Sequence, residues 1–258
     1  MPVGSLTVVG TGIELGSQLT PEARVALERA DLVFSAVAEP AMQALVARLN
    51  PNTRSLHTFY ELGESRTRAY EAMTEEILRH VREGLEVCAA FYGHPGVFVA
   101  PSHEAIRRAR AEGFPARMLP AVSAEDCLFA DLGVDPSRFG CQSYEATDFL
   151  VRRRTIDTGA LLILWQVGLV GEWRYERVPS MRSLPLLVER LLELYPAEHE
   201  TILYEASQYP FCDPIVERLP LAAVPSAELS PVVTMVLPPR GEPAFDPEML
   251  ERVTLRRS

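Results

Sequence analysis

The stretch that decides the fold runs from residue 85 to residue 96 and reads LEVCAAFYGHPG. Its first part, Leu85–Phe91, is a nearly continuous apolar run, which is typical of a strand buried on both faces of a parallel sheet. The strand ends at Tyr92-Gly93-His94-Pro95-Gly96, and a helix is predicted from Ser102 to Glu112. Because ligands bind beyond the carboxyl ends of parallel strands, this loop is either the first candidate binding site or a tight structural turn.

Strands and helices alternate on both sides of this stretch. Strands are predicted over residues 5–9, 32–37, 54–58 and 116–119, and helices over 21–30, 40–49 and 65–82. Thr20 followed by Pro21 is a favourable N-cap and first helical position. The alternation predicts a mostly parallel sheet with helices on both faces.

The pattern changes after residue 119. A helix is predicted over 124–132 and another over 184–195, with strands over 161–166, 201–204 and 232–237. We therefore expect an α/β fold in two domains: residues 1–119 with the parallel sheet, and residues 120–240 with a mixed or antiparallel sheet. Residues 241–258 are rich in proline and charge and are expected to form a tail.

The composition excludes several functions. The 258 residues carry 25 basic and 35 acidic side chains, for a net charge of −10, and the sequence contains no lysine. Schiff-base lysines, lysine general bases and the P-loop lysine are therefore excluded. The acidic balance argues against a nucleic-acid partner, which would require basic surface.

The cysteines, the amino-terminal residues and the histidines indicate where the protein is located and whether it binds a metal. The four cysteines form no CxxC pair, and the amino-terminal residues lack a charged region followed by a long apolar one. The longest apolar run, residues 159–171, is interrupted by Gln166 and is too short for a bilayer. We expect a cytoplasmic protein without membrane contact. His94 has only His103 nearby, so no metal site is predicted.

A second glycine motif follows the first predicted strand. Gly10 and Gly12 can turn the backbone tightly and let a ligand approach it. The next glycine, Gly16, is one position too far for the GxGxxG pattern of dinucleotide sites. A plain strand-to-helix turn is the competing interpretation.

Three further side chains form a candidate catalytic group. Arg66 and Tyr70 share one helical stripe with Met73 and Ile77, which should face the core. Together with Tyr60, they would supply hydroxyl groups and a fixed cation suited to a developing negative oxygen. The alternative is a structural arginine over the helix end with two packed tyrosine rings.

Taken in order, these segments resemble the tetrapyrrole methylase superfamily of S-adenosylmethionine (SAM)-dependent methyltransferases. The resemblance covers roughly residues 5 to 240 and rests on residues 8–13, 19–23, 30–33, 93–96 and 119–124. It implies two domains with SAM in the cleft between them, and a homodimer.

The closer likeness is to the borosin peptide backbone α-N-methyltransferases. This likeness implies catalytic roles for Tyr60, Arg66 and Tyr70, and leaves open which tyrosine is the base. It also implies SAM as the methyl donor, S-adenosylhomocysteine (SAH) as the product and no metal. The residues implied to hold SAM are Tyr92, His94, Val97, Ala124, Gln166, Ala206, Val233 and Thr234.

The chain departs from the fused borosins in one respect. Those carry their substrate as a C-terminal extension, whereas residues 238–258 are charged and contain no apolar run to methylate. The resemblance is therefore to the split form, whose substrate is a separate precursor peptide. Two alternatives stay open: a C-methyltransferase of tetrapyrroles such as precorrins or uroporphyrinogen, and a SAM- or peptide-binding module without turnover.

Overall fold

The computed structural model describes residues 4–61, 63–176 and 180–254. Contacts between residues divide the chain into two units. Unit 1 consists of residues 1–134, 171–180 and 205–215, and unit 2 of residues 135–170, 181–204 and 216–258. Each unit is made of three separate segments of the chain. From the sequence we instead expect contiguous domains that divide near residue 119, and that boundary stays a prediction.

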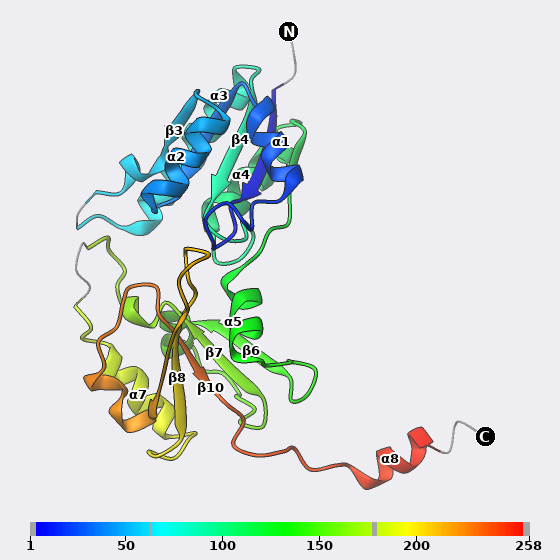
Figure 1. Cartoon of the computed structure of the whole chain (residues 1–258), viewed down its shortest axis with the longest axis vertical. Coiled ribbons are helices and arrows are strands. Elements are labelled where there is room, and N and C mark those ends of the chain that lie inside the picture. The colour runs from blue at the N-terminus through cyan, green and yellow to red at the C-terminus, as the bar shows by residue number, and fades with distance from the viewer. Residues whose placement is uncertain (1–3, 62, 177–179, 255–258) are drawn as a thin grey trace. The chain divides into compact units, whose positions relative to one another are not determined.

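Unit 1 is built on a five-stranded sheet in the order β3-β2-β4-β1-β5. Every pairing described in this sheet is parallel, as the alternation of strands and helices predicts. Its strands are β1 (Ser5–Gly10), β2 (Leu32–Ala36), β3 (Thr53–Ser55), β4 (Glu86–Phe91) and β5 (Ala116–Met118). The central position of β4 explains its continuous apolar sequence, since helices cover it on both sides (Figure 1).

Successive residues of β4 belong to two different cores. Val87, Ala89 and Phe91 pack with side chains of α3 and α4, whereas Cys88 and Ala90 pack with side chains of α1 and α2. This division follows from the alternation of side chains along a strand. The helices of unit 1 are α1 (Pro21–Arg29), α2 (Pro40–Leu49), α3 (Arg66–Arg82), α4 (Ala100–Ala111) and α5 (Ala124–Leu132).

Unit 2 contains a mixed five-stranded sheet in the order β6-β7-β10-β8-β9. β6 pairs with β7 in parallel, and β10 runs antiparallel to both β7 and β8. Helices α6 and α7 pack on it and share one core with β7 and β10. The bounds are β6 (Cys141–Glu145), α6 (Ala146–Val151), β7 (Leu161–Trp165), α7 (Leu184–Leu192), β8 (Glu200–Glu205), β9 (Ile215–Pro220), β10 (Thr234–Leu237) and α8 (Pro247–Thr254).

The sequence prediction is wrong at one strand and incomplete at several elements. The strand expected over residues 54–58 ends at Ser55, and a 3₁₀ helix, η1 (Leu56–Phe59), follows it. The turn forms because the Ser55 hydroxyl accepts the N–H of His57 at 3.2 Å while the Leu56 side chain is fully buried. Short elements without a long apolar run were missed, namely β6, α6, β9, α8 and the 3₁₀ helices η2 (Val167–Leu169) and η3 (Leu221–Ser226).

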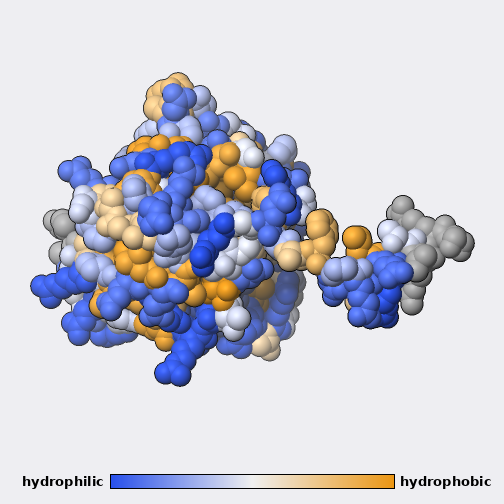
Figure 2. All heavy atoms as spheres, turned by 90° about the horizontal axis from the view of Figure 1, so that it is seen from below, coloured by the Kyte–Doolittle hydropathy of each residue, from blue (hydrophilic) through white to orange (hydrophobic). Residues whose placement is uncertain are grey.

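Helix α8 lies within the tail expected after residue 240. Each of its residues is exposed, including the apolar Met249, Leu250 and Val253. Figure 2 shows both hydrophobic and hydrophilic side chains on its surface. Within the described ranges, no helix has the length and apolar character needed to cross a membrane.

Asn50 joins α2 to α1 and provides a test of the unit 1 packing. Its buried amide nitrogen donates to the carbonyl oxygens of Leu27 at 2.9 Å and Ala30 at 2.8 Å, at the end of α1. Asn50→Ala leaves both acceptors without this donor, so we expect a loss of about 1–3 kcal/mol in the free energy of unfolding.

Urea unfolding at neutral pH measures this loss. The matched control is Arg48→Ala, which removes an exposed side chain of the same helix and should change the free energy of unfolding by at most about 0.5 kcal/mol. Equal unfolding midpoints for the two variants would contradict the structural role of Asn50.

Candidate functional site

Two glycine loops meet at the carboxyl ends of the adjacent strands β1 and β4. Gly10 pairs with Phe91 in the sheet, and a Cβ atom at Gly10 would lie only 2.1 Å from the carbonyl oxygen of Gly93. Just beyond, the Gly93 N–H donates to the Gly12 carbonyl oxygen at 3.0 Å. Both Gly12 (φ 73°) and Gly93 (φ 69°) adopt the left-handed conformation that favours glycine. The motif is therefore a close crossing of two backbones.

The His94 ring takes part in the turn that carries it. Its Nδ1 atom accepts the N–H of Gly96 at 2.9 Å, and the Gly96 carbonyl oxygen lies 2.9 Å from Nε2 of His103. Nδ1 is therefore engaged within the loop. Among the residues that the structure describes, no group of three or more His, Cys, Asp or Glu side chains could hold a metal ion.

Tyr92 opens the same loop and is half-buried. Burial, followed by the nearby Cys127 and Glu205, raises the pKa of Tyr92 to about 12. Its hydroxyl group therefore keeps its proton at neutral pH and can donate a hydrogen bond.

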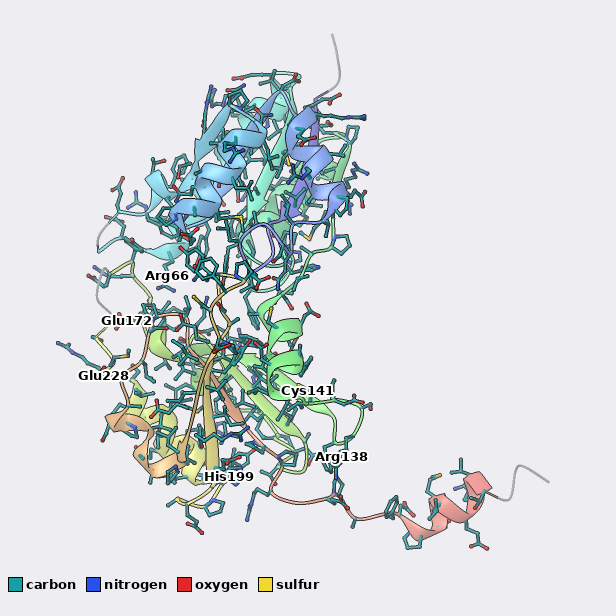
Figure 3. All side chains as sticks on the ribbon, in the orientation of Figure 1. Arg66, Arg138, Cys141, Glu172, His199 and Glu228 are labelled. Atoms are coloured by element: carbon teal, nitrogen blue, oxygen red, sulfur yellow. The ribbon has the colours of Figure 1, made fainter. Side chains whose placement is uncertain are left out.

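Arg66 and Tyr70 lie at the start of α3, where the sequence stripe predicts them. Met73 and Ile77 of that stripe are buried in the core, as expected, whereas Arg66 and Tyr70 are half-buried. Figure 3 labels Arg66, whose side chain projects from the first turn of the helix. Met73 and Ile77 are thus part of the core, and Arg66 and Tyr70 lie at its edge, where they are partly exposed.

Tyr60 follows η1 and its ring meets that of Tyr70. The ring centroids are 6.3 Å apart and the planes lie at 83° to each other. Burial, followed by the neighbouring Tyr70 hydroxyl, raises the pKa of Tyr60 well above its ordinary value, although the charge of Arg66 lowers it. The structure thus brings the predicted tyrosine pair together beside Arg66, with the Tyr60 hydroxyl protonated.

Two residues that the sequence analysis did not select complete the surroundings of Tyr60. The ring of Tyr175 stacks on the Tyr60 ring, with the two centroids 5.0 Å apart. The His57 ring is tilted relative to the Tyr60 ring, and their centroids are 5.8 Å apart. Burial lowers the pKa of His57. His57 is close to Tyr60 in the sequence and could have been found by proximity. Tyr175 is far along the chain, and no local pattern indicates it.

The other predicted SAM contacts are divided between the two units. In unit 1, the Val97 N–H donates to the His94 carbonyl oxygen at 3.1 Å, Ala124 begins α5 and Ala206 follows β8. In unit 2, Gln166 directly follows β7 and has a φ of 57°, which is uncommon outside glycine.

The remaining two predicted contacts are Val233 and Thr234, which are buried at the start of β10. The carbonyl oxygen of Val233 accepts the N–H of Val167 at 3.1 Å, next to Gln166. Unit 2 therefore places its three predicted contacts at neighbouring strand ends.

The raised pKa of Tyr60 predicts how stability depends on alkaline pH. Unfolding exposes the phenol to water, where its pKa is about 10. Above that pH the unfolded chain loses this proton before the folded chain does, so the free energy of unfolding falls as the pH rises. Tyr60→Phe removes this contribution, and urea unfolding between about pH 9 and pH 11 should show a shallower fall than in the wild type. Parallel curves would contradict the burial of this hydroxyl group.

Curated relatives are similar over nearly the whole chain. A methyltransferase/ribosomally synthesized cyclic peptide omphalotin A precursor from Omphalotus olearius is 43% identical over 98% of this chain, which spans 62% of that protein. A methyltransferase/ribosomally synthesized type III borosin cyclic peptide precursor from Anomoporia bombycina is 40% identical over 99% of this chain, which spans 30% of it. The chain thus corresponds to part of these relatives.

A solved structure shares the fold. The crystal structure of uroporphyrin-III-C-methyltransferase from Thermus thermophilus matches with a TM-score of 0.67 and 22% identity, over 92% of each chain. The family model of tetrapyrrole (corrin/porphyrin) methylases matches residues 5–210. With its parallel sheet followed by a mixed sheet, the chain belongs to the tetrapyrrole methylase family.

Proposed function

We propose that this chain transfers a methyl group from SAM to backbone amide nitrogens of a peptide. The observation that carries the proposal is the pair of tyrosines, Tyr60 and Tyr70, beside the charge of Arg66. The likeness to relatives whose names join a methyltransferase to a cyclic peptide precursor supports it, at 40–43% identity.

The family implies SAM, and the residues fit such a ligand. The close crossing of Gly10 and Gly93 fixes the loops at the carboxyl ends of β1 and β4, and Tyr92 in one of these loops offers a protonated hydroxyl. The strained Gln166 is of the kind that clusters at ligand sites. We infer that these residues hold SAM together with His94, Val97, Ala124, Ala206, Val233 and Thr234. SAM would supply an electrophilic methyl group.

An amide nitrogen is a poor nucleophile because its lone pair is delocalised into the carbonyl group. In our proposal the amide loses its proton, the carbonyl oxygen gains negative charge, and the nitrogen then forms the new N–C bond as SAH departs. The chain must therefore accept one proton and stabilise one oxyanion.

Because the Tyr60 hydroxyl keeps its proton, we assign the two tyrosines different roles, one as a hydrogen-bond donor and the other as the proton acceptor. Because burial keeps the proton on Tyr60, its hydroxyl group suits a hydrogen-bond donor to the oxyanion. Arg66 cannot be deprotonated in a protein, so it supplies a fixed positive charge for the same oxygen. Tyr70 is left as the group that would accept the amide proton, directly or through water, which requires its phenolate form and converts it to the phenol.

The proposed reaction requires a peptide substrate. We infer a precursor peptide as the substrate, because the names of the relatives join a methyltransferase to a cyclic peptide precursor. The homodimer that the resemblance implies stays a prediction.

SAM with a deuterated methyl group tests the reaction. Purified protein is given two substrates in parallel, a short peptide encoded beside its gene and uroporphyrinogen, and tandem mass spectrometry locates the label. We expect label on backbone nitrogens of the peptide. Label on a macrocycle carbon would replace our proposal with a tetrapyrrole C-methyltransferase, and SAM binding without transfer to either would favour a binding module.

Two substitutions test the roles of the catalytic group. Arg66→Ala removes the fixed cation and Tyr70→Phe removes the proton acceptor, so each should abolish measurable methyl transfer, a loss of at least about 10²–10³-fold. Because neither side chain is assigned to SAM, calorimetry should show SAH affinity within a few-fold of the wild type.

Arg68→Ala is the matched control for the arginine. Arg68 is exposed on the same turn of α3 and pairs with Glu64 at 2.9 Å, so this variant should keep its rate. Full activity in Arg66→Ala or Tyr70→Phe would overturn the assignment of roles.

A further inference from the structure

Residues 173–175 pair with the loop that precedes α3. The Gly63 N–H donates to the Tyr175 carbonyl oxygen at 2.9 Å, and the Tyr175 N–H donates to the Glu64 carbonyl oxygen at 2.9 Å. Ser65 and Arg174 form an antiparallel bridge between these contacts. The two stretches belong to unit 1, although Arg174 lies 111 positions from Gly63.

This pairing also supports the first turn of the catalytic helix. The first N–H groups of a helix have no partner within it and are usually satisfied by an N-cap side chain. Within the described residues, the N-cap Ser65 makes no side-chain capping bond. The Arg66 N–H instead donates to the Trp173 carbonyl oxygen at 3.4 Å. Residues 173–175 thus hold the backbone from which the Arg66 side chain projects.

The side chain of Tyr175 also contacts the candidate site, because its ring stacks on the ring of Tyr60. It lies nearly parallel to the Tyr60 ring, with an angle of 28° between the planes, while the Tyr70 ring meets Tyr60 nearly at a right angle. A phenol ring has two rotatable bonds, so a stacked face and a perpendicular neighbour together restrict the direction of its hydroxyl group.

We propose that Tyr175 is a positioning residue that fixes the Tyr60 ring and, through the pairing of residues 173–175, the start of α3 at Arg66. The inference rests on the proposed function, because Tyr60 and Arg66 are assigned there to the developing oxyanion. Tyr175 acts through its ring face and its backbone, and its own hydroxyl group is dispensable. A donor misplaced by about 1 Å loses much of its effect on a reaction, so loss of the ring lowers the rate.

Four variants separate the ring from the hydroxyl group. Tyr175→Phe keeps the ring, Tyr175→Ala removes it, and Tyr175→Leu keeps apolar volume without a stacking face. Phe211→Ala is the control for removing an aromatic ring from the same unit, because Phe211 is 82% exposed and stacks on Tyr209. Each variant is compared with the wild type in thermal unfolding before any other measurement.

The first readout requires no substrate. Hydrogen exchange at the backbone amides of Gly63 and Arg66 reports opening of their bonds to residues 173–175. We expect exchange at least about tenfold faster in Tyr175→Ala and Tyr175→Leu, and unchanged exchange in Tyr175→Phe and Phe211→Ala.

The second readout is methyl transfer to the peptide. We expect kcat to fall at least about tenfold in Tyr175→Ala and Tyr175→Leu with KM for SAM within twofold, and Tyr175→Phe to restore the wild-type rate. A rate as low in Tyr175→Phe as in Tyr175→Ala would overturn positioning by the ring. Wild-type exchange or wild-type kcat in folded Tyr175→Ala would overturn the inference as well.

Failure of the proposed function has a different signature. If the wild type labels no peptide, the methylation proposal fails, and the hydrogen-exchange comparison still decides whether Tyr175 holds Tyr60 and Arg66. If the wild type labels the peptide and Tyr175→Ala does so equally well, only the positioning role is lost.

Discussion

The absence of a side chain at Gly10 is the constraint on which unit 1 depends. A Cβ there would meet the Gly93 carbonyl oxygen at 2.1 Å, the Ala121 side chain at 2.6 Å and the Pro95 ring at 2.8 Å. Two other stretches of chain, residues 93–95 and the stretch around Ala121, therefore converge on one glycine, and none of the three contacting atoms can rotate away. Any other residue would push apart the loops after β1 and β4, which carry residues proposed to hold SAM.

At Tyr60, burial outweighs the charge of Arg66. The guanidinium favours the phenolate, whereas desolvation and the hydroxyl of Tyr70 favour the phenol, and the pKa rises. A cation next to a tyrosine is therefore insufficient to create a base. The same surroundings fit the opposite role, since a phenol that keeps its proton can donate it as a hydrogen bond. In the proposed reaction, Arg66 then acts on the substrate oxygen rather than on Tyr60.

The parts of the molecule that the sequence predicts are those governed by local periodicity. The continuous apolar run of β4 and the four-three-four stripe of α3 identify the parallel sheet and the rim position of Arg66 and Tyr70, because burial repeats along one element. The short 3₁₀ turn at Leu56–Phe59 depends on one hydroxyl contact, and the half-buried β6 lacks an apolar run, so neither gives a periodic signal. Whether the predicted residues contact SAM or peptide is a question of chemistry that periodicity does not address.

Tyr175 shows why the candidate site could not be completed from the sequence. Its contact with Tyr60 joins stretches separated by about half of unit 1 and by part of unit 2, and no spacing rule relates them. Residues 171–180 nevertheless belong to unit 1. A fragment ending at residue 119 would keep Tyr60, Arg66 and Tyr70 but lose the pairing that satisfies the Arg66 N–H and the ring that stacks on Tyr60. Helix α3 therefore depends on residues 173–175, which lie far along the chain from it, and the candidate site is a property of the assembled unit.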